Sequence, residues 1–208
     1  MLLKKQLSDH IFNMVLGLTV LYGLAANIVT AMLFGPIFRT WSYTLLLFIW
    51  IIFGFAGILL LKKHKFWSHV LAYHLIVVPF GPVLSGLLNM YSSSQVILAI
   101  SMTAVITAIM LVLSSLFPRF FAKLHGVLLL ALGLSLGVSF FGRFLGFPVS
   151  RLSIISVIIF SLYFGYDWYH AQHSEKSINN AIMVAIDFYL DIINIFLRLL
   201  EAMSSDDD

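Results

Sequence analysis

The chain has 208 residues, of which 61% are hydrophobic and 10% are charged, and its formal net charge is +3. A soluble domain carries about 25% charged residues, so this composition indicates a polytopic membrane protein with almost no soluble part. The basic residues occur in short segments between apolar runs, which argues against a nucleic-acid partner, and the absence of cysteine excludes disulfides and thiolate metal sites.

Seven apolar runs are long enough to cross a bilayer, at about 20 residues per span. In chain order they are Ile11–Phe34, Trp41–Leu61, Val70–Met90, Val96–Leu116, Leu124–Phe141, Leu152–Tyr169 and Asn180–Met203. No soluble domain or linker separates them. We therefore expect a single transmembrane domain over residues 1–208, surrounded by the lipid of a bacterial plasma membrane, with a disordered acidic tail at 204–208.

The basic residues between these runs favour one side of the predicted bundle. Eight of them fall on one side, Lys4, Lys5, Lys62, Lys63, Lys65, Arg119, Lys123 and Lys176, and three on the other, Arg39, Arg143 and Arg151. Since basic loops stay in the cytoplasm, we expect a cytoplasmic N-terminus and an acidic tail on the far side. A re-entrant last helix would return the tail to the cytoplasm, and the sequence leaves that alternative open.

The third run is interrupted by residues that disturb a helix. It contains Pro79 and Pro82 with Gly81 and Gly86 close by. Proline removes a backbone donor, and the freed carbonyl needs a protein or water partner in lipid. A packing kink and a broken helix beside a cavity are equally compatible with this pattern. His74, in the same run, is expected to make a packing hydrogen bond.

The last run combines an apolar composition with one polar stripe. Steps of seven, four, three, four and three residues place the polar residues on a single helix face. They are Asn180, Asp187, Asp191, Asn194, Arg198 and Glu201. A helix lying on the membrane surface usually carries a broad basic face, whereas this stripe is narrow and holds two carboxylates. We therefore predict an all-α integral membrane protein, a seven-helix bundle whose last helix is central and is wrapped by the other six.

Three aspartates within the apolar runs are the candidate functional residues: Asp167, Asp187 and Asp191. Carboxylates in a membrane domain should face protein or water, where they can bind Ca²⁺, hold a shared proton, or do both. A set of structural hydrogen bonds is the alternative. In a simple hairpin of the last two runs, Asp167 would face Met183, and Asp191 would lie about 12 Å deeper at 1.5 Å per residue.

His170 and His173 follow Asp167, and Glu175 comes shortly after them. This spacing could belong to a metal site, but no further ligand on a rigid element accompanies it. We expect a solvated interfacial loop here, whose histidines could tune the pH response of Asp167. No tightly bound cofactor is expected; Ca²⁺ and H⁺ would be transported or sensed ions.

Two motifs near the C-terminus resemble those of the Bax inhibitor-1 family, also called the TMBIM family. The first consists of Phe160, Ser161, Leu162, Tyr163, Tyr166 and Asp167, and the second of Tyr189, Leu190, Asp191, Ile192, Ile193, Asn194, Ile195 and Phe196. The seven runs, the cytoplasmic N-terminus and the Gly-Pro of the third run agree with the family layout. The strong match covers about the last quarter of the chain.

The resemblance implies six helices around a seventh and a pH-sensitive Ca²⁺ leak gated by two aspartates, which correspond to Asp167 and Asp191. In bacterial members a basic residue after the second span latches onto the sixth-helix aspartate, and Lys62 occupies that position. Arginine is typical there, and lysine cannot make its bidentate pairing. Asp187 departs from the small or apolar residue usual in the family, and it could shift a neighbour's protonation or add an ion ligand.

Two other functions are less consistent with the sequence. An intramembrane aspartyl protease would pair a Tyr-Asp with Gly-x-Gly-Asp, but Phe188, Tyr189 and Leu190 precede Asp191. A retinal protein needs a lysine in the last helix, and none follows Lys176. We therefore do not expect an enzyme. The serious alternative is a non-conducting regulator that binds other membrane proteins, such as death regulators or a membrane protease.

Overall fold

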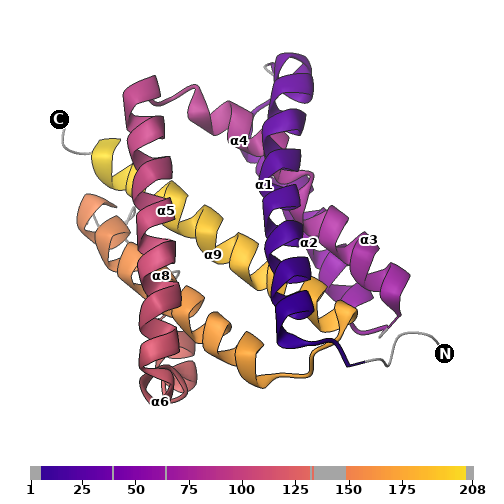
Figure 1. Cartoon of the computed structure of the whole chain (residues 1–208). Helices are drawn as coiled ribbons and strands as arrows, with labels where there is room; N and C mark the ends of the chain where they lie inside the picture. The colour runs from indigo at the N-terminus through magenta and orange to yellow at the C-terminus, as the bar shows by residue number, and fades with distance from the viewer. Residues whose placement is uncertain (1–5, 39, 64, 132, 134–148, 205–208) are drawn as a thin grey trace. The chain divides into compact units, whose positions relative to one another are not determined.

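The computed structural model describes residues 6–38, 40–63, 65–131, 133 and 149–204, and the regular structure within them is helical (Figure 1). The labelled helices are α1 (Asp9–Phe38), α2 (Tyr43–Leu61), α3 (Phe66–Val77), α4 (Phe80–Leu88), α5 (Ser93–Leu116), α6 (Pro118–Phe121), α8 (Val149–His173) and α9 (Ile178–Ser204). The predicted all-α class is confirmed for this part of the chain.

Five helical segments in the described residues are long and apolar enough to cross a membrane. They are Asp9–Phe38, Thr44–Leu61, Phe66–Leu88, Ser93–Leu116 and Leu152–His173. These segments match five of the predicted spans, so the chain is a multi-pass integral membrane protein. The fifth predicted span, Leu124–Phe141, lies mostly outside the described residues, of which 125–131 are helical. The seventh corresponds to α9, which has 27 residues and is not among those five segments.

The third predicted span is a broken helix, in which Val78 and Pro79 separate α3 from α4. An uninterrupted helix would bond the Val78 carbonyl to the N–H of residue 82, but that residue is Pro82. Instead, the Gly81 N–H donates to this carbonyl at 3.2 Å and the Thr30 hydroxyl at 3.4 Å. Neighbouring groups thus satisfy the carbonyl that the proline leaves without a donor.

A pocket of about 310 Å³ lies beside the broken helix. Gly35 and Phe38 of α1 line it together with Pro82, Ser85 and Asn89. The sequence allowed a packing kink or a broken helix beside a cavity; the interruption falls at Val78 and Pro79, and the pocket lies along α4.

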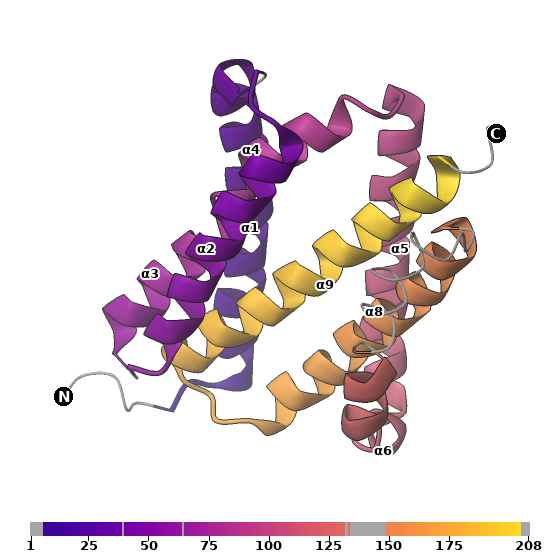
Figure 2. The same cartoon turned by 180° about the vertical axis from the view of Figure 1, so that it is seen from behind.

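The chain divides into two compact units. The first consists of Met1–Met90 with Ser174–Tyr189, and the second of Tyr91–His173 with Leu190–Asp208. In the first unit α2 packs against α3, and α1 packs against α4 (Figure 1). In the second unit α5 and α6 pack against α8 (Figure 2). The N-terminal part of α9 belongs to the first unit and its C-terminal part to the second.

Helix α9 is buried along most of its length, whereas α1, α2 and α5 expose many large apolar side chains. The buried apolar residues of α9 are Ala181, Ile182, Val184, Ala185, Ile186, Phe188, Tyr189, Ile193, Ile195, Phe196, Leu199 and Leu200. In lipid, large apolar side chains on the outer helices contact acyl chains and carry no desolvation penalty. The burial pattern agrees with an interior position for α9, while its enclosure by six other helices stays a prediction.

Candidate functional site

The C-terminal half of α8 is held against α5 and α6 by a close backbone approach at Gly165. The Ser114 hydroxyl of α5 donates to the Gly165 carbonyl at 2.6 Å, and the Trp168 indole donates to Ser115 at 2.9 Å. A Cβ at Gly165 would collide with the ring of Phe121, which is 2% exposed. Glycine therefore permits the packing that sets the position of the next turn, which carries Asp167.

Tyr163 connects the two aspartates that the motifs single out. Its phenol lies within electrostatic range of both Asp167 and Asp191, and all three residues belong to the second unit. Asp191 is 6% exposed, and Asp167 is half-buried. Tyr163 was missed as a site residue although it lies four residues before Asp167, on the same helix face.

Asp187 has a different environment from Asp191, although one helical turn separates them in α9. The Asp187 side chain is exposed and belongs to the first unit. Within the described residues, no three His, Cys, Asp or Glu side chains come together in a way that could hold a metal ion. Asp191 is therefore buried and Asp167 half-buried, whereas Asp187 is a separate, exposed carboxylate.

His170 and His173 lie in the last turn of α8, so the predicted solvated loop at these residues was wrong. His173 Nδ1 hydrogen-bonds the Tyr169 carbonyl at 2.8 Å, one turn earlier. The prediction ended the element where the apolar run ended, but a helix can continue past the hydrocarbon because its backbone bonds are internal. Both histidines are nevertheless exposed, as expected.

A cluster of aromatic rings lies next to Asp167, near the exposed C-terminal end of α8. The ring of Tyr166 stacks with that of His170 at a centroid distance of 6.1 Å. The ring of His125 also lies beside Tyr166, at a centroid distance of 5.4 Å. The Tyr166 phenol is also within electrostatic range of Asp167. The imidazoles of His125 and His170 thus both neighbour Tyr166, whose phenol is close to the Asp167 carboxylate.

Comparison with known families shows which family the chain belongs to. The family described as inhibitor of apoptosis-promoting Bax1 matches residues 5–208, which is nearly the whole chain. The chain belongs to the Bax inhibitor-1 family. The resemblance read from two C-terminal motifs is thereby confirmed over the full length. No curated protein matches the chain closely enough to be reported as a relative.

Membership in the Bax inhibitor-1 family agrees with the multi-pass helical structure. The family is generally one of non-enzymatic membrane proteins, in line with the incomplete protease motif. Lys62, the residue predicted to act as a latch, follows the last residue of α2 and is exposed in the first unit. Asp167 lies in the second unit, and its pairing with Lys62 stays a prediction.

The C-terminal half of the polar stripe is occupied by hydrogen bonds within the second unit. The Asn194 amide donates to the Leu190 carbonyl at 2.7 Å. Arg198 and Ser153 both donate to Oε2 of Glu201, at 2.7 and 2.8 Å. Ser153 was not predicted as part of this network, because a serine in an apolar run carries no signal of its partner. The polar stripe therefore joins α9 to α8 at a point further towards the C-terminus of α9 than Asp191.

Lys176 fastens the connection between α8 and α9 to the start of α1. Its side chain is 8% exposed, with Nζ 3.8 Å from Asp9 and 4.6 Å from the centroid of the Phe12 ring. The Leu7 N–H donates to the Lys176 carbonyl at 2.7 Å. Burial lowers the pKa of Lys176, and the Asp9 carboxylate opposes this shift. This lysine, read from sequence only as a loop charge, anchors the N-terminus.

Proposed function

We propose that the chain is a slow, proton-sensitive Ca²⁺ leak pathway of the Bax inhibitor-1 type, gated by Asp167 and Asp191. The observation that carries this proposal is that Tyr163 lies within electrostatic range of both aspartates, of which Asp191 is only 6% exposed. A structural hydrogen-bond set does not need two carboxylates around one phenol.

The chemistry of the pair supports both ion sensing and proton sensing. Two carboxylates near one another in a low-dielectric interior cannot both ionise without a compensating cation. A proton or a divalent ion can supply that compensation, and oxygen ligands suit Ca²⁺. Protons and Ca²⁺ should then compete, so Ca²⁺ binding weakens as pH falls. The pair titrates as a unit rather than as two independent residues.

The proposal includes an orientation and a latch. The eight basic residues on one side favour a cytoplasmic location for the N-terminus and for the segment from Lys62 to Lys65. In the closed state Lys62 pairs with Asp167 and holds the cytoplasmic end shut. A lysine makes a point-charge contact, whereas arginine would make a bidentate one, so this latch is weaker than the family's usual form.

A non-conducting regulator of other membrane proteins is the second candidate. It is favoured by the description of the matched family, which names inhibition of apoptosis-promoting Bax1. In that case the aspartates would stabilise the bundle and no ion would pass.

Reconstitution separates the two candidates. Purified protein is placed in liposomes loaded with a Ca²⁺-sensitive dye, and flux is measured on either side of neutral pH against empty liposomes. The leak pathway predicts a Ca²⁺ flux that varies with pH. A folded, correctly inserted protein that gives no flux at any pH would favour the regulator.

A further inference from the structure

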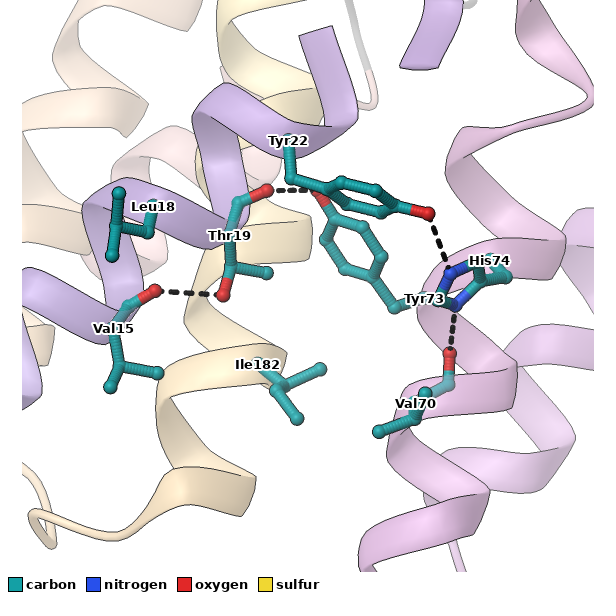
Figure 3. A pocket seen from close by; sticks show the side chains of 8 residues that line it. All are labelled: Val15, Leu18, Thr19, Tyr22, Val70, Tyr73, His74 and Ile182. Carbon is teal, nitrogen blue, oxygen red and sulfur yellow. Dashed lines mark hydrogen bonds between the residues drawn. The ribbon is translucent and has the colours of Figure 1, made fainter. Parts of the chain in front are cut away.

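A second pocket, of about 330 Å³, lies in the first unit between α1 and α3 (Figure 3). Tyr22 and His74 form its polar edge, and apolar side chains such as Leu18 and Ile182 form the remainder. Leu18 is 60% exposed and Tyr22 is 49% exposed, so the pocket opens to the outside of the helices rather than into a core. Its volume is at the small end of the range for ligand sites.

The hydrogen bonds around this pocket determine which polar group it offers. His74 Nδ1 lies 2.7 Å from the Val70 carbonyl, which can only accept, so this nitrogen carries a hydrogen. In the neutral ring Nε2 is then an acceptor, and the Tyr22 hydroxyl 2.9 Å away donates to it. Figure 3 shows this chain of bonds from Val70 through His74 to Tyr22.

The other hydroxyl hydrogens of the pocket are also committed. Tyr73 donates to the Thr19 carbonyl at 2.5 Å, and the Thr19 hydroxyl donates to the Val15 carbonyl at 2.7 Å. The exposed Tyr22 oxygen can still accept a hydrogen bond through its lone pairs. The pocket therefore presents a hydrogen-bond acceptor without a free donor, on an otherwise apolar surface.

The depth of the pocket restricts the occupant further. Tyr22 is thirteen residues beyond Asp9, the first residue of α1, which is about 20 Å along the axis at 1.5 Å per residue. The hydrocarbon core of a bilayer is about 30 Å thick, so charged headgroups do not reach this level without a large cost. An ionised carboxylate would also meet an acceptor oxygen instead of a donor.

We propose that this pocket binds an uncharged, membrane-soluble alcohol, whose hydroxyl donates to Tyr22 while its apolar body lies against α1 and α3. Ketones, esters and ethers bind less well, because they would have to displace His74 from the Tyr22 hydrogen. The source can be a straight-chain alcohol or an isoprenoid alcohol, since both carry the same hydroxyl on an apolar body. The site is independent of Asp167 and Asp191, and its test measures binding rather than flux.

The test uses the full chain in phospholipid nanodiscs with a photoreactive long-chain alcohol whose diazirine lies near the hydroxyl. Labelled peptides are mapped by mass spectrometry. Unlabelled hexadecanol, its methyl ether and an isoprenoid alcohol such as farnesol serve as competitors. We expect labelling in the α1 and α3 segments around Tyr22 and His74, with competition by the alcohols well ahead of the ether. The stronger of the two alcohols identifies the source.

Two variants make the outcome specific. Tyr22→Phe combined with His74→Phe removes the Tyr22 oxygen together with His74 Nε2, which Tyr22→Phe alone would leave as an open acceptor. Hexadecanol should then compete about three- to tenfold less well, the range for one neutral hydrogen bond, while the ether is unchanged. Leu18→Trp should reduce labelling by filling the pocket. Met32→Trp, on an exposed side chain of the same helix, should leave it unchanged. Equal competition by alcohol and ether, or full alcohol competition in the double variant Tyr22→Phe with His74→Phe, would overturn the proposal.

Discussion

The guanidinium of Arg198 donates to Oε2 of Glu201 at 2.7 Å, three residues further along α9. Ser153 of α8 donates to the same oxygen, so this carboxylate joins two helices. The two charged side chains are 20% and 25% exposed, which leaves their pairing only partly screened.

We expect Arg198→Met to lower the free energy of unfolding by about 1–3 kcal/mol, because Glu201 would keep its charge in a partly buried site after losing its guanidinium partner. Ser153→Ala should cost about 1 kcal/mol. The measurement is denaturant or thermal unfolding in detergent. The double variant Arg198→Met with Glu201→Leu should recover much of the loss, since no unpaired charge remains; additive losses would contradict the pairing.

The close approach at Gly165 predicts a second effect on stability. Gly165→Ala should cost about 1–3 kcal/mol, because its Cβ would meet the buried Phe121 ring and force α8 away from α6. Gly54→Ala in α2 is the matched control, since nothing lies within 4 Å of its added Cβ. That variant should be neutral or stabilising by up to about 1 kcal/mol. Similar effects at both glycines would show that packing at α8 is not the cause.

The burial of Lys176 predicts a pH dependence of stability. Its pKa in the folded state lies below the ordinary 10.5, so between those two values the unfolded chain binds more protons than the folded one. Stability therefore rises with pH through this window and levels off above 10.5. Lys176→Met should remove this part of the rise, measured as the difference between the two unfolding profiles. Lys63→Met, at an exposed position, should leave the profile unchanged.

The different environments of the α9 aspartates predict different effects on ion flux. Asp191→Asn should abolish pH-dependent Ca²⁺ flux, because it removes the buried member of the proposed gating pair. Asp187→Asn should shift the pH midpoint and leave conduction in place, because this carboxylate is exposed and one turn away. The measurement is flux against pH in liposomes. Normal pH dependence in Asp191→Asn would refute its gating role, and loss of flux in Asp187→Asn alone would mean that the roles are reversed.

The proposed latch predicts opposite effects of two substitutions at Lys62. Lys62→Arg should lower the resting Ca²⁺ leak, because a guanidinium can pair with the Asp167 carboxylate through two hydrogen bonds. Lys62→Ala should raise the leak. Lys63→Ala serves as the control in the same connection. Unchanged flux in both Lys62 variants, with protein inserted normally, would remove the latch from the mechanism.

The helical class, the multi-pass membrane location and the family could all be predicted from the sequence. Apolar content and periodicity act over a few turns, so they are properties of local segments. A disturbance of the helix near Val77 could also be predicted, as a kink or as a break, because Pro79 and Pro82 change the backbone bonding wherever they stand. The ends of helices were harder to predict from the sequence, as His170 and His173 show. Hydropathy marks where the hydrocarbon ends, and α8 continues beyond that point.

Only the tertiary structure decided which side chains meet. Tyr22 and His74 are 52 residues apart, and Ser153 and Glu201 are 48 apart, yet each pair forms a hydrogen bond. Tyr163 and Asp191 also belong to different helices, and the phenol lies within electrostatic range of the carboxylate. Periodicity assigns a residue to a face of its own helix, but the rotation and tilt of each helix follow from packing against its neighbours. Those two quantities set the partners, and no local pattern in the sequence contains them.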